Sequence, residues 1–215
     1  MSDDMHGGRA ADEAALFWED RYRRHGRLWK GTPNPLLAET AERLAPGRAL
    51  DLGCGEGGDA AWLAARGWQV TAVDIAPAAL ELTAEHAARA GVADRVTTEL
   101  HDLARGFPSG SFELVSAQYL QTPFDLPRER VLRRAAHALA PGGLLLVVEH
   151  GSRHPWSSVD PDTRFPTPEE IYAGIGLDPA GWTPERLDTP RREATGPGGR
   201  TAVVTDTVIA VRRAA

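Results

Sequence analysis

Residues 49–58 join a short apolar run to a cluster of glycines, in the order Ala-Leu-Asp-Leu-Gly-Cys-Gly-Glu-Gly-Gly. The apolar run predicts a short buried strand that the glycines end, and residues 59–66 then predict a helix. Glycines between a strand and a helix let the backbone approach a nucleotide closely, but an ordinary tight turn between two such elements uses them as well. The loop alone therefore indicates a βαβ unit and leaves its ligand open.

Strands and helices continue to alternate as far as residue 150. Helices are predicted at 77–90, which has a proline at its start and a glycine just past its end, and at 127–139. Apolar or alternating segments predict further strands at 68–73, 95–100, 111–116 and 144–148. This alternation predicts parallel strands with helices on both faces, which is an α/β, Rossmann-like three-layer sandwich.

The last third of the chain departs from this alternation. Residues 151–168 are rich in proline and predict a long loop, after which Thr167 is placed to cap a short helix. Strands are predicted at 182–193 and 201–212, on either side of a Gly- and Pro-rich loop. Because strands joined in this way form a hairpin, we expect a seven-stranded, mostly parallel sheet with a C-terminal antiparallel hairpin.

The segment before the glycine loop has a different character. Residues 1–11 are polar and unpatterned and predict a mobile tail, whereas 12–24 mix aromatic and charged residues as an amphipathic helix does. A proline near the start of 35–44 is typical of the first turn of a helix. We therefore expect residues 1–47 to supply a tail and lid helices that pack on one domain formed by residues 48–215.

Composition narrows the class of protein and of partner. The formal net charge is −6 and no cluster of Lys and Arg offsets it locally, so a nucleic-acid substrate is not expected. The apolar runs fall far short of the ~20 residues of a membrane span, and the N-terminus lacks the pattern of a signal peptide. The single cysteine, Cys54, cannot form an internal disulfide. These features predict a cytoplasmic protein, monomer or homodimer, with a small-molecule partner and no membrane contact.

Three aspartates near the ends of successive predicted strands indicate which nucleotide the loop binds. Asp51 lies inside the first strand, where a carboxylate would repel a dinucleotide diphosphate but attract a cationic ligand. Asp74 ends the second strand, about twenty residues beyond the loop, where an acid can accept hydrogen bonds from ribose hydroxyls. Asp102 follows the third strand. Each aspartate alone is equally explained as a turn or cap residue, but together they face one crevice.

Residues 48–150 resemble a class I S-adenosylmethionine-dependent methyltransferase. The motifs that carry the resemblance are Leu50-Asp51-Leu52-Gly53-Cys54-Gly55, Val73-Asp74-Ile75, His101-Asp102-Leu103 and Pro141-Gly142-Gly143. The C-terminal hairpin agrees with the antiparallel last strand of that family. The N-terminal segment Phe17–Tyr22, with Trp29 and Pro33-Asn34-Pro35, also resembles small bacterial members that methylate thiols, thiopurines or tellurite.

The resemblance implies a role for each matching position. The loop residues Gly53, Cys54 and Gly55 would hold the methionine part of S-adenosylmethionine, with Asp51 and Gln118 near its ammonium group. Asp74 would bind the ribose, Asp102 would accept from the adenine amino group, and Ile75 and Leu103 would enclose the adenine ring. Cys54 is expected to be a small packing residue rather than a reactive thiol.

The methyl acceptor is expected above the ends of the fourth and fifth strands, beneath the N-terminal helices. The candidates for this substrate pocket are Tyr22, Trp29, Tyr119, His150 and Trp156. His150 directly follows the fifth strand, where it either abstracts a proton from the acceptor or serves a structural role. Glu149, His150 and His154 lack the helical ligand spacing of a metal site, so no metal is predicted.

Three functions remain open at this point. The first is transfer of a methyl group from S-adenosylmethionine to a sulfur, oxygen or nitrogen nucleophile on a small molecule, with S-adenosylhomocysteine as the product. The second is an NAD(P)-dependent oxidoreductase; against it, the only lysine, Lys30, lies outside the βαβ segment that such an enzyme would use. The third is a non-catalytic S-adenosylmethionine-binding module, which would not need an aromatic N-terminal lid.

Overall fold

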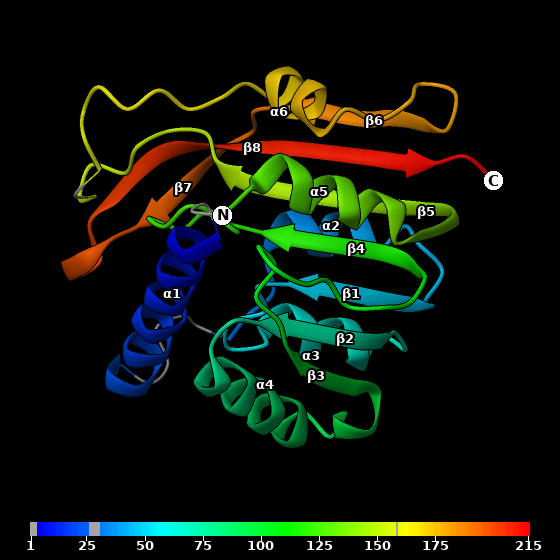
Figure 1. Cartoon of the computed structure of the whole chain (residues 1–215), viewed down its shortest axis with the longest axis horizontal. Helices are drawn as coiled ribbons and strands as arrows, with labels where there is room; N and C mark the ends of the chain where they lie inside the picture. Colours follow the sequence, from blue (N-terminus) through cyan, green and yellow to red (C-terminus); the bar gives the residue numbers. More distant parts are fainter. Residues whose placement is uncertain (1–3, 26–30, 158) are drawn as a thin grey trace.

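One mixed sheet organises the computed structural model, which describes residues 4–25, 31–157 and 159–215 (Figure 1). Its strands lie in the order β3-β2-β1-β4-β5-β8-β6, with β7 paired to β8 beside this path. The strands are β1 (Arg48–Leu52), β2 (Gln69–Asp74), β3 (Val96–Leu100), β4 (Phe112–Gln118), β5 (Leu139–His150), β6 (Trp182–Asp188), β7 (Arg191–Thr195) and β8 (Thr201–Arg213). Strands β1 to β5 are parallel, and β8 runs antiparallel to β5, β6 and β7.

Helices cover both faces of the sheet, which confirms the predicted three-layer α/β sandwich. The helices are α1 (Asp4–His25), α2 (Pro35–Ala41), α3 (Gly58–Ala65), α4 (Pro77–Arg89), α5 (Arg128–His137) and α6 (Pro168–Ile175), with short 3-10 turns at Ala93–Arg95 and Pro197–Gly199. Side chains of α2, α3 and α4 pack in the core on one face, and those of α5 and α6 in the core on the other. No helix among the described residues is long and apolar enough to cross a bilayer.

The fifth strand shows why a continuous apolar run is needed in this fold. Residues 144–148 are all buried, and they alternate between the two cores: Leu144, Leu146 and Val148 lie in one, Leu145 and Val147 in the other. A strand covered by helices on both faces has no solvent side on which polar residues are favoured. The prediction of a buried strand at this position is confirmed.

Local sequence signals set the ends of several helices. The Asn34 side chain accepts a hydrogen bond from the Leu36 amide at 2.9 Å and so caps α2. At α6, Thr167 and Glu170 form a reciprocal capping box. Each arrangement satisfies amide groups that have no partner within the first helical turn.

The C-terminal hairpin differs from its predicted form in one respect. The segment predicted as one strand at 182–193 is divided into β6 and β7, and both pair with the long strand β8. Pro190 lies at the division and has no amide to donate, although its carbonyl accepts from the Asp206 amide at 3.0 Å. The sheet therefore has the predicted seven strands along its path and β7 as an eighth.

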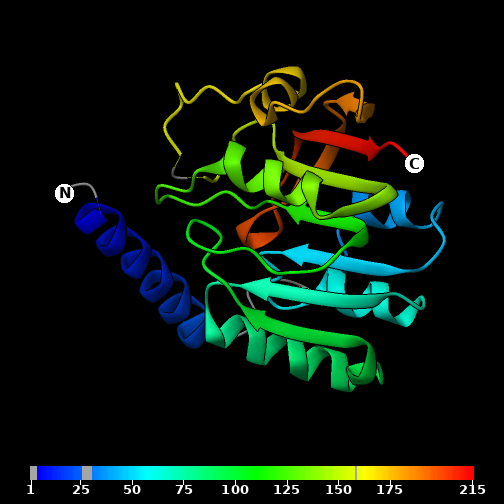
Figure 2. The ribbon, with the colours of Figure 1, turned by 45° about the vertical axis from the view of Figure 1, so that its right-hand side comes forward.

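The N-terminal segment is helical from Asp4, so the prediction of an unstructured tail over residues 1–11 is wrong from that residue onward. Helix α1 lies at the carboxyl ends of the parallel strands (Figure 1), and Figure 2 shows its N-terminal half extending beyond the sheet. Its C-terminal half packs on α4, where Tyr22 and Trp18 join a small apolar cluster with Ala76, Ala78 and Ala79.

Candidate functional site

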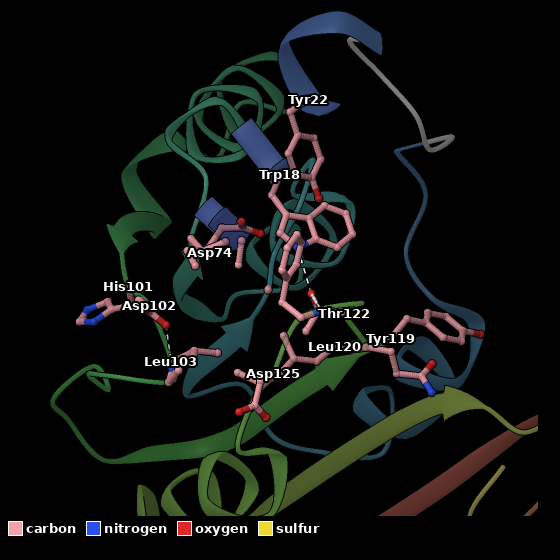
Figure 3. A pocket seen from close by; sticks show the side chains of 17 residues that line it. Trp18, Tyr22, Asp74, His101, Asp102, Leu103, Tyr119, Leu120, Thr122 and Asp125 are labelled. Carbon is pink, nitrogen blue, oxygen red and sulfur yellow. Dashed lines mark hydrogen bonds between the residues drawn. The ribbon is translucent and has the colours of Figure 1, made fainter. Parts of the chain in front are cut away.

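A cavity of about 130 Å³ lies at the carboxyl ends of β1 to β4, beneath α1 (Figure 3). Elements that are far apart in sequence supply its walls. They are helix α1, the glycine loop, and the segments that follow β2, β3 and β4. The lining residues include Trp18, Tyr22, Gly53, Asp74, Ile75, Asp102, Leu103, Tyr119, Leu120, Gln121 and Thr122. Ligands of open α/β sheets bind in this crevice at the carboxyl ends of the strands.

The glycine loop has a backbone that other residues adopt only with strain. Gly53 and Gly55 have φ of 70° and 55°. A Cβ on Gly53 would lie 2.6 Å from the Leu120 side chain, and one on Gly55 would lie 3.1 Å from the Tyr22 hydroxyl. The loop is also tied to β2, because the Gly53 and Cys54 amides donate to the Val73 carbonyl at 2.8 and 2.9 Å. Space and conformation both require glycine at these two positions.

Asp74 is held rigidly at the end of β2. Its two carboxylate oxygens accept from the Gly55 amide at 3.1 Å and the Ala76 amide at 3.0 Å. Burial raises the pKa of this carboxyl, and the backbone hydrogen bonds counteract part of that rise. A carboxylate offers about four acceptor positions, so the backbone contacts do not use all of them. Asp74 lines the cavity, where a hydroxyl donor can use what remains.

Two buried acceptors lie together between β1 and β4. Asp51 pairs in register with Ser116, and the Gln118 side-chain amide donates to the Ser116 hydroxyl at 2.9 Å. Asp51 Oδ2 and Gln118 Oε1 are both buried and have no hydrogen-bond partner. Burial, with a smaller contribution from the nearby carboxylates of Asp59 and Asp74, raises the pKa of Asp51 well above its usual range. A positively charged donor would satisfy both of these acceptor atoms and offset the charge of the Asp51 carboxylate.

The segment after β3 forms another wall of the cavity. Asp102 Oδ1 accepts from the Ala104 amide at 2.9 Å, and Arg105 lies 3.4 Å from its other oxygen. Leu103 is buried and lines the cavity, as does Ile75 from the segment after β2. The structure therefore brings Asp102, Leu103 and Ile75 to one space, as the resemblance implies.

Cys54 contributes to this site through its backbone. The thiol is buried and lies 3.5 Å from the Thr83 hydroxyl of α4. Burial, reinforced by Asp74 and Asp51, raises its pKa well above the ordinary value. The thiol is therefore protonated and packed, as expected for a structural cysteine.

The expected acceptor residues fall into two groups. Tyr22 and Tyr119 line the cavity, whereas His150 and Trp156 lie beside it in a row of ring contacts that begins at Tyr119. Trp29 lies outside the described residues. In Figure 3 the Tyr119 ring is set to one side, apart from Trp18, Tyr22 and Asp74. Within the part of the chain that is described, no three His, Cys, Asp or Glu side chains are grouped as metal ligands.

The comparisons with known proteins agree with this geometry. The family described as "Methyltransferase domain" matches residues 49–143, which hold the glycine loop and the acids that follow it. Residues 49–143 are thereby identified as a class I S-adenosylmethionine-dependent methyltransferase domain. The predicted family, enzyme class and methyl donor are thereby confirmed.

Individual relatives of this methyltransferase differ in the acceptors that their names state. The chain is 32% identical over 147 residues to "Ribosomal RNA small subunit methyltransferase C" of Alcanivorax borkumensis, covering 64% of this chain and 43% of that protein. It is 29% identical over 173 residues to "2-heptyl-1-hydroxyquinolin-4(1H)-one methyltransferase" of Mycobacteroides abscessus, covering 78% of this chain and 73% of that protein. The methyltransferase spans less than half the length of several curated relatives that it matches.

A solved structure extends the likeness to nearly the whole chain. The structure described as "Conversion of a Disulfide Bond into a Thioacetal Group during Echinomycin Biosynthesis" superposes with a TM-score of 0.71 at 25% identity, covering 93% of each chain. This coverage extends well beyond residues 49–143, the range of the family match.

Several residues at the site were not found from the sequence. Leu120, Gln121 and Thr122 line the cavity but have no motif, because they follow β4 as an ordinary loop. Trp18 could be recognised only as an aromatic residue of a helix. Its indole nitrogen donates to the Thr122 hydroxyl at 3.4 Å, across 104 positions of sequence. Contacts of this range depend on the fold, so no local pattern announces them.

Proposed function

We propose that this methyltransferase transfers a methyl group from S-adenosylmethionine to a nucleophile on a small molecule. The observation that carries the proposal is the enclosure of the cavity by α1. Trp18 and Tyr22 both line the cavity, and Tyr22 is only 7% exposed. A site roofed by a helix admits a compact molecule more readily than a folded polymer.

Contacts on both sides of the cavity hold α1 in this position. Toward α4, Glu19 accepts from the Ala78 amide at 2.7 Å and Arg23 binds both carboxylate oxygens of Glu81. Toward the loop after β4, the Phe17 and Phe124 rings lie 5.3 Å apart, edge to face. The helix thus bridges two walls of the cavity, which supports its proposed role in excluding water from the reaction.

The unpartnered acceptors support a position for the amino-acid end of the cofactor beside Asp51 and Gln118. An ammonium group has donors for both Asp51 Oδ2 and Gln118 Oε1, and its charge offsets that of the buried carboxylate. Gly53 and Gly55, whose positive φ favours glycine, leave the loop without side chains at these two positions, where the cofactor would pass. The residues present therefore fit S-adenosylmethionine.

The nucleoside end would lie on the other walls. Asp74 would accept from the ribose hydroxyls with the part of its carboxylate that the backbone leaves free, and Asp102 would accept from the adenine amino group. Ile75 and Leu103 offer apolar surface to the ring on both sides. The sulfonium of the bound cofactor supplies an already activated methyl group, so the protein mainly has to align the acceptor and exclude water.

Ribosomal RNA is the second candidate acceptor, because of the name of the Alcanivorax relative. The net charge of −6 opposes the approach of a phosphate backbone, and that relative aligns over less than half of its length. The Mycobacteroides relative, named for a small heteroaromatic substrate, aligns over most of both chains and favours a small acceptor. The narrower resemblance to thiol, thiopurine or tellurite methyltransferases stays a prediction, as do the monomeric or dimeric state and the cytoplasmic location.

Two measurements test the proposal. Calorimetry should show that the wild-type protein binds S-adenosylhomocysteine and does not bind NADH. Asp74→Asn should bind S-adenosylhomocysteine at least tenfold more weakly, because hydrogen bonds to a charged group are lost. Turnover with methyl-labelled donor should then occur on members of a panel of thiols, phenols and heterocycles, and not on ribosomal RNA. NADH binding without S-adenosylhomocysteine binding, or turnover confined to RNA, would overturn it. Binding without turnover of any nucleophile would favour a non-catalytic module.

A further inference from the structure

A second group of polar side chains adjoins the cavity on the β5 side. It consists of Tyr119, His150, His154, Arg192 and Asp206, which we call the hairpin cluster because its last two members come from β7 and β8. The Tyr119 and His150 rings stack at 4.5 Å, and His150 and His154 meet edge to face at 5.0 Å. Arg192 Nε donates to Asp206 Oδ2 at 2.6 Å, and the guanidinium carbon lies 6.0 Å from the Tyr119 ring. Three distant parts of the chain thus meet at one point.

The cluster depends on the extra strand of this sheet. The first part of β8, Thr201–Thr205, pairs with β7, whereas Asp206–Arg212 pairs with β5. Asp206 therefore stands where β8 passes from one partner to the other, opposite His150 in the register. Figure 1 shows β7 and the start of β8 at the same end of the sheet as α1. The hairpin carries Arg192 and Asp206 to the carboxyl ends of β4 and β5.

Unpartnered atoms indicate that this cluster can bind a polar ligand. Asp206 is 1% exposed and its Oδ1 has no hydrogen-bond partner, although the Tyr119 side chain interacts with this carboxylate. His150 Nδ1 and His154 Nε2 are likewise buried and unpartnered. A buried polar atom without a partner costs about 1–3 kcal/mol, so three in one place are a strong sign of a missing polar group.

The backbone conformation of Tyr119 independently indicates a functional site. Among the described residues, Tyr119 is the only residue other than glycine with a positive φ, at 53°. Such a conformation costs on the order of 1 kcal/mol or more for a bulky residue and is concentrated at functional sites. Tyr119 follows directly after β4, lines the cavity and stacks its ring on His150.

The cluster and the cavity share a wall. Tyr119 and Gln121 line the cavity, and the Gln121 side chain accepts from the His150 amide at 3.1 Å. The His150 ring therefore lies directly behind the part of the cavity wall that Tyr119 and Gln121 form.

We propose that the hairpin cluster binds the methyl acceptor through a hydroxyl group on an aromatic or heteroaromatic ring, and that His150 takes the hydroxyl proton. This rests on the proposed function. The unpartnered carboxylate oxygen of Asp206 and a neutral imidazole both accept a hydrogen bond, which a hydroxyl supplies. Asp206 disfavours an acidic acceptor and Arg192 disfavours a cationic one. The rings of Tyr119 and His150 give a planar acceptor aromatic surface to pack on.

Burial and the charged neighbours of His150 together keep its ring neutral. Burial, with a further contribution from His154, lowers the pKa of His150 to about 4, while Asp206 opposes this and Arg192 adds to it. The ring is therefore neutral at ordinary pH. In transfer, the hydroxyl proton moves to the ring nitrogen and the oxygen lone pair forms the bond to the methyl carbon. The carbon–sulfur bond breaks with its electron pair left on sulfur, and the imidazolium then releases its proton to water.

Matched probes test this assignment. At about pH 5.5, where the His150 ring is neutral, we use 4-nitrophenol as a hydroxyl acceptor that keeps its proton, 4-nitrothiophenol as a thiol that ionises without help, and nitrobenzene as a ring with neither group. In the presence of S-adenosylhomocysteine, calorimetry should show 4-nitrophenol binding at least tenfold more tightly than nitrobenzene. His150→Gln should weaken 4-nitrophenol binding about tenfold and reduce its methylation about hundredfold or more, since general-base catalysis contributes 10²–10⁴-fold. Turnover of 4-nitrothiophenol and affinity for S-adenosylhomocysteine should change less than about threefold.

His137→Gln serves as the matched control, because His137 is an exposed residue of α5 on the opposite face of the sheet. Equal losses on the phenol and the thiol in His150→Gln would show a structural role and overturn the proposal, as would no loss on either. If His150→Gln does not fold, the wild-type comparison of 4-nitrophenol with nitrobenzene still tests whether the protein recognises the hydroxyl group. A wild-type protein that methylates thiols but neither binds nor methylates 4-nitrophenol would contradict this inference and leave the proposed function intact.

Discussion

Replacement of Asp51 by asparagine should move stability and cofactor affinity in opposite directions. The carboxyl is 2% exposed, one of its oxygens has no partner, and burial and the neighbouring acids raise its pKa. Without a cation beside it, the charged form is unfavourable in the folded protein. The same charge is what an ammonium group would bind. Asp51→Asn keeps the shape of the side chain and removes the charge.

The pH dependence follows from the direction of the shift. Because folding raises the pKa of Asp51, its stabilising contribution is complete below the unfolded pKa near 4 and is lost as the pH rises through the folded pKa. Asp59, with a pKa raised to about 6 mainly by burial, and Asp74 shift in the same direction. The ligand-free wild type should therefore lose part of its stability as the pH rises above about 4, and Asp51→Asn should lose less.

The expected magnitudes come from the cost of a buried group without a partner, about 1–3 kcal/mol. For a chain of this size, the same figure corresponds to a rise in Tm of about 2–12 °C for Asp51→Asn at pH 8 and little change at pH 4. Loss of a charged hydrogen bond of about 1.5–3 kcal/mol should weaken S-adenosylhomocysteine binding roughly tenfold to hundredfold.

Thermal unfolding at several pH values and calorimetry with S-adenosylhomocysteine measure the two effects. Asp94→Asn, at an exposed position in a turn, is the control for the loss of one charge. The reasoning fails if Asp51→Asn is less stable than wild type at pH 8, or if it binds S-adenosylhomocysteine as tightly. The first result would mean that the apoprotein already compensates the carboxylate, and the second that the ammonium lies elsewhere.

Two further substitutions test the packing that shapes the site. Gly53→Ala should weaken S-adenosylhomocysteine binding and lower Tm, because its Cβ meets the Leu120 side chain at 2.6 Å and its φ is 70°. Adding Leu120→Ala should restore only part of the loss, since the backbone strain of about 1 kcal/mol persists; full recovery would show that the clash alone matters. Trp68→Ala removes a 1% exposed indole from the core beneath α3 and should cost about 3–5 kcal/mol in urea unfolding, whereas less than about 1 kcal/mol would contradict its place in the core.

The sequence predicted the layered architecture because hydrophobic periodicity and glycine turns are local signals. The buried run at 144–148, the glycine loop and the aspartates all fall where those signals placed them. The division of the 182–193 segment was missed, although Pro190 was visible. A proline interrupts one pairing of a strand, but only the fold shows that β8 is long enough to pair on both sides of the interruption.

The candidate site was predictable only in part, for a related reason. Asp51, Asp74 and Asp102 follow strand ends, so parallel-sheet geometry brings them together without knowledge of the packing. No comparable rule of sheet geometry predicts the hairpin cluster from the sequence. Tyr119, Arg192 and Asp206 lie far apart in sequence, and Arg192 becomes significant only once β7 is known to fold back beside β4 and β5. The extra strand is absent from the predicted seven-stranded plan.

The position of β6 at the end of the strand order bears on how the molecule behaves at high concentration. An outer strand exposes unpaired amide and carbonyl groups, to which a strand of another molecule can add. In β6 this edge carries Pro184, which has no amide hydrogen, beside the charged residues Glu185 and Arg186, and the register shifts between Pro184 and Arg186. Replacing Pro184 with a β-branched residue would regularise the edge, so the same position that limits pairing within the sheet also guards against self-association.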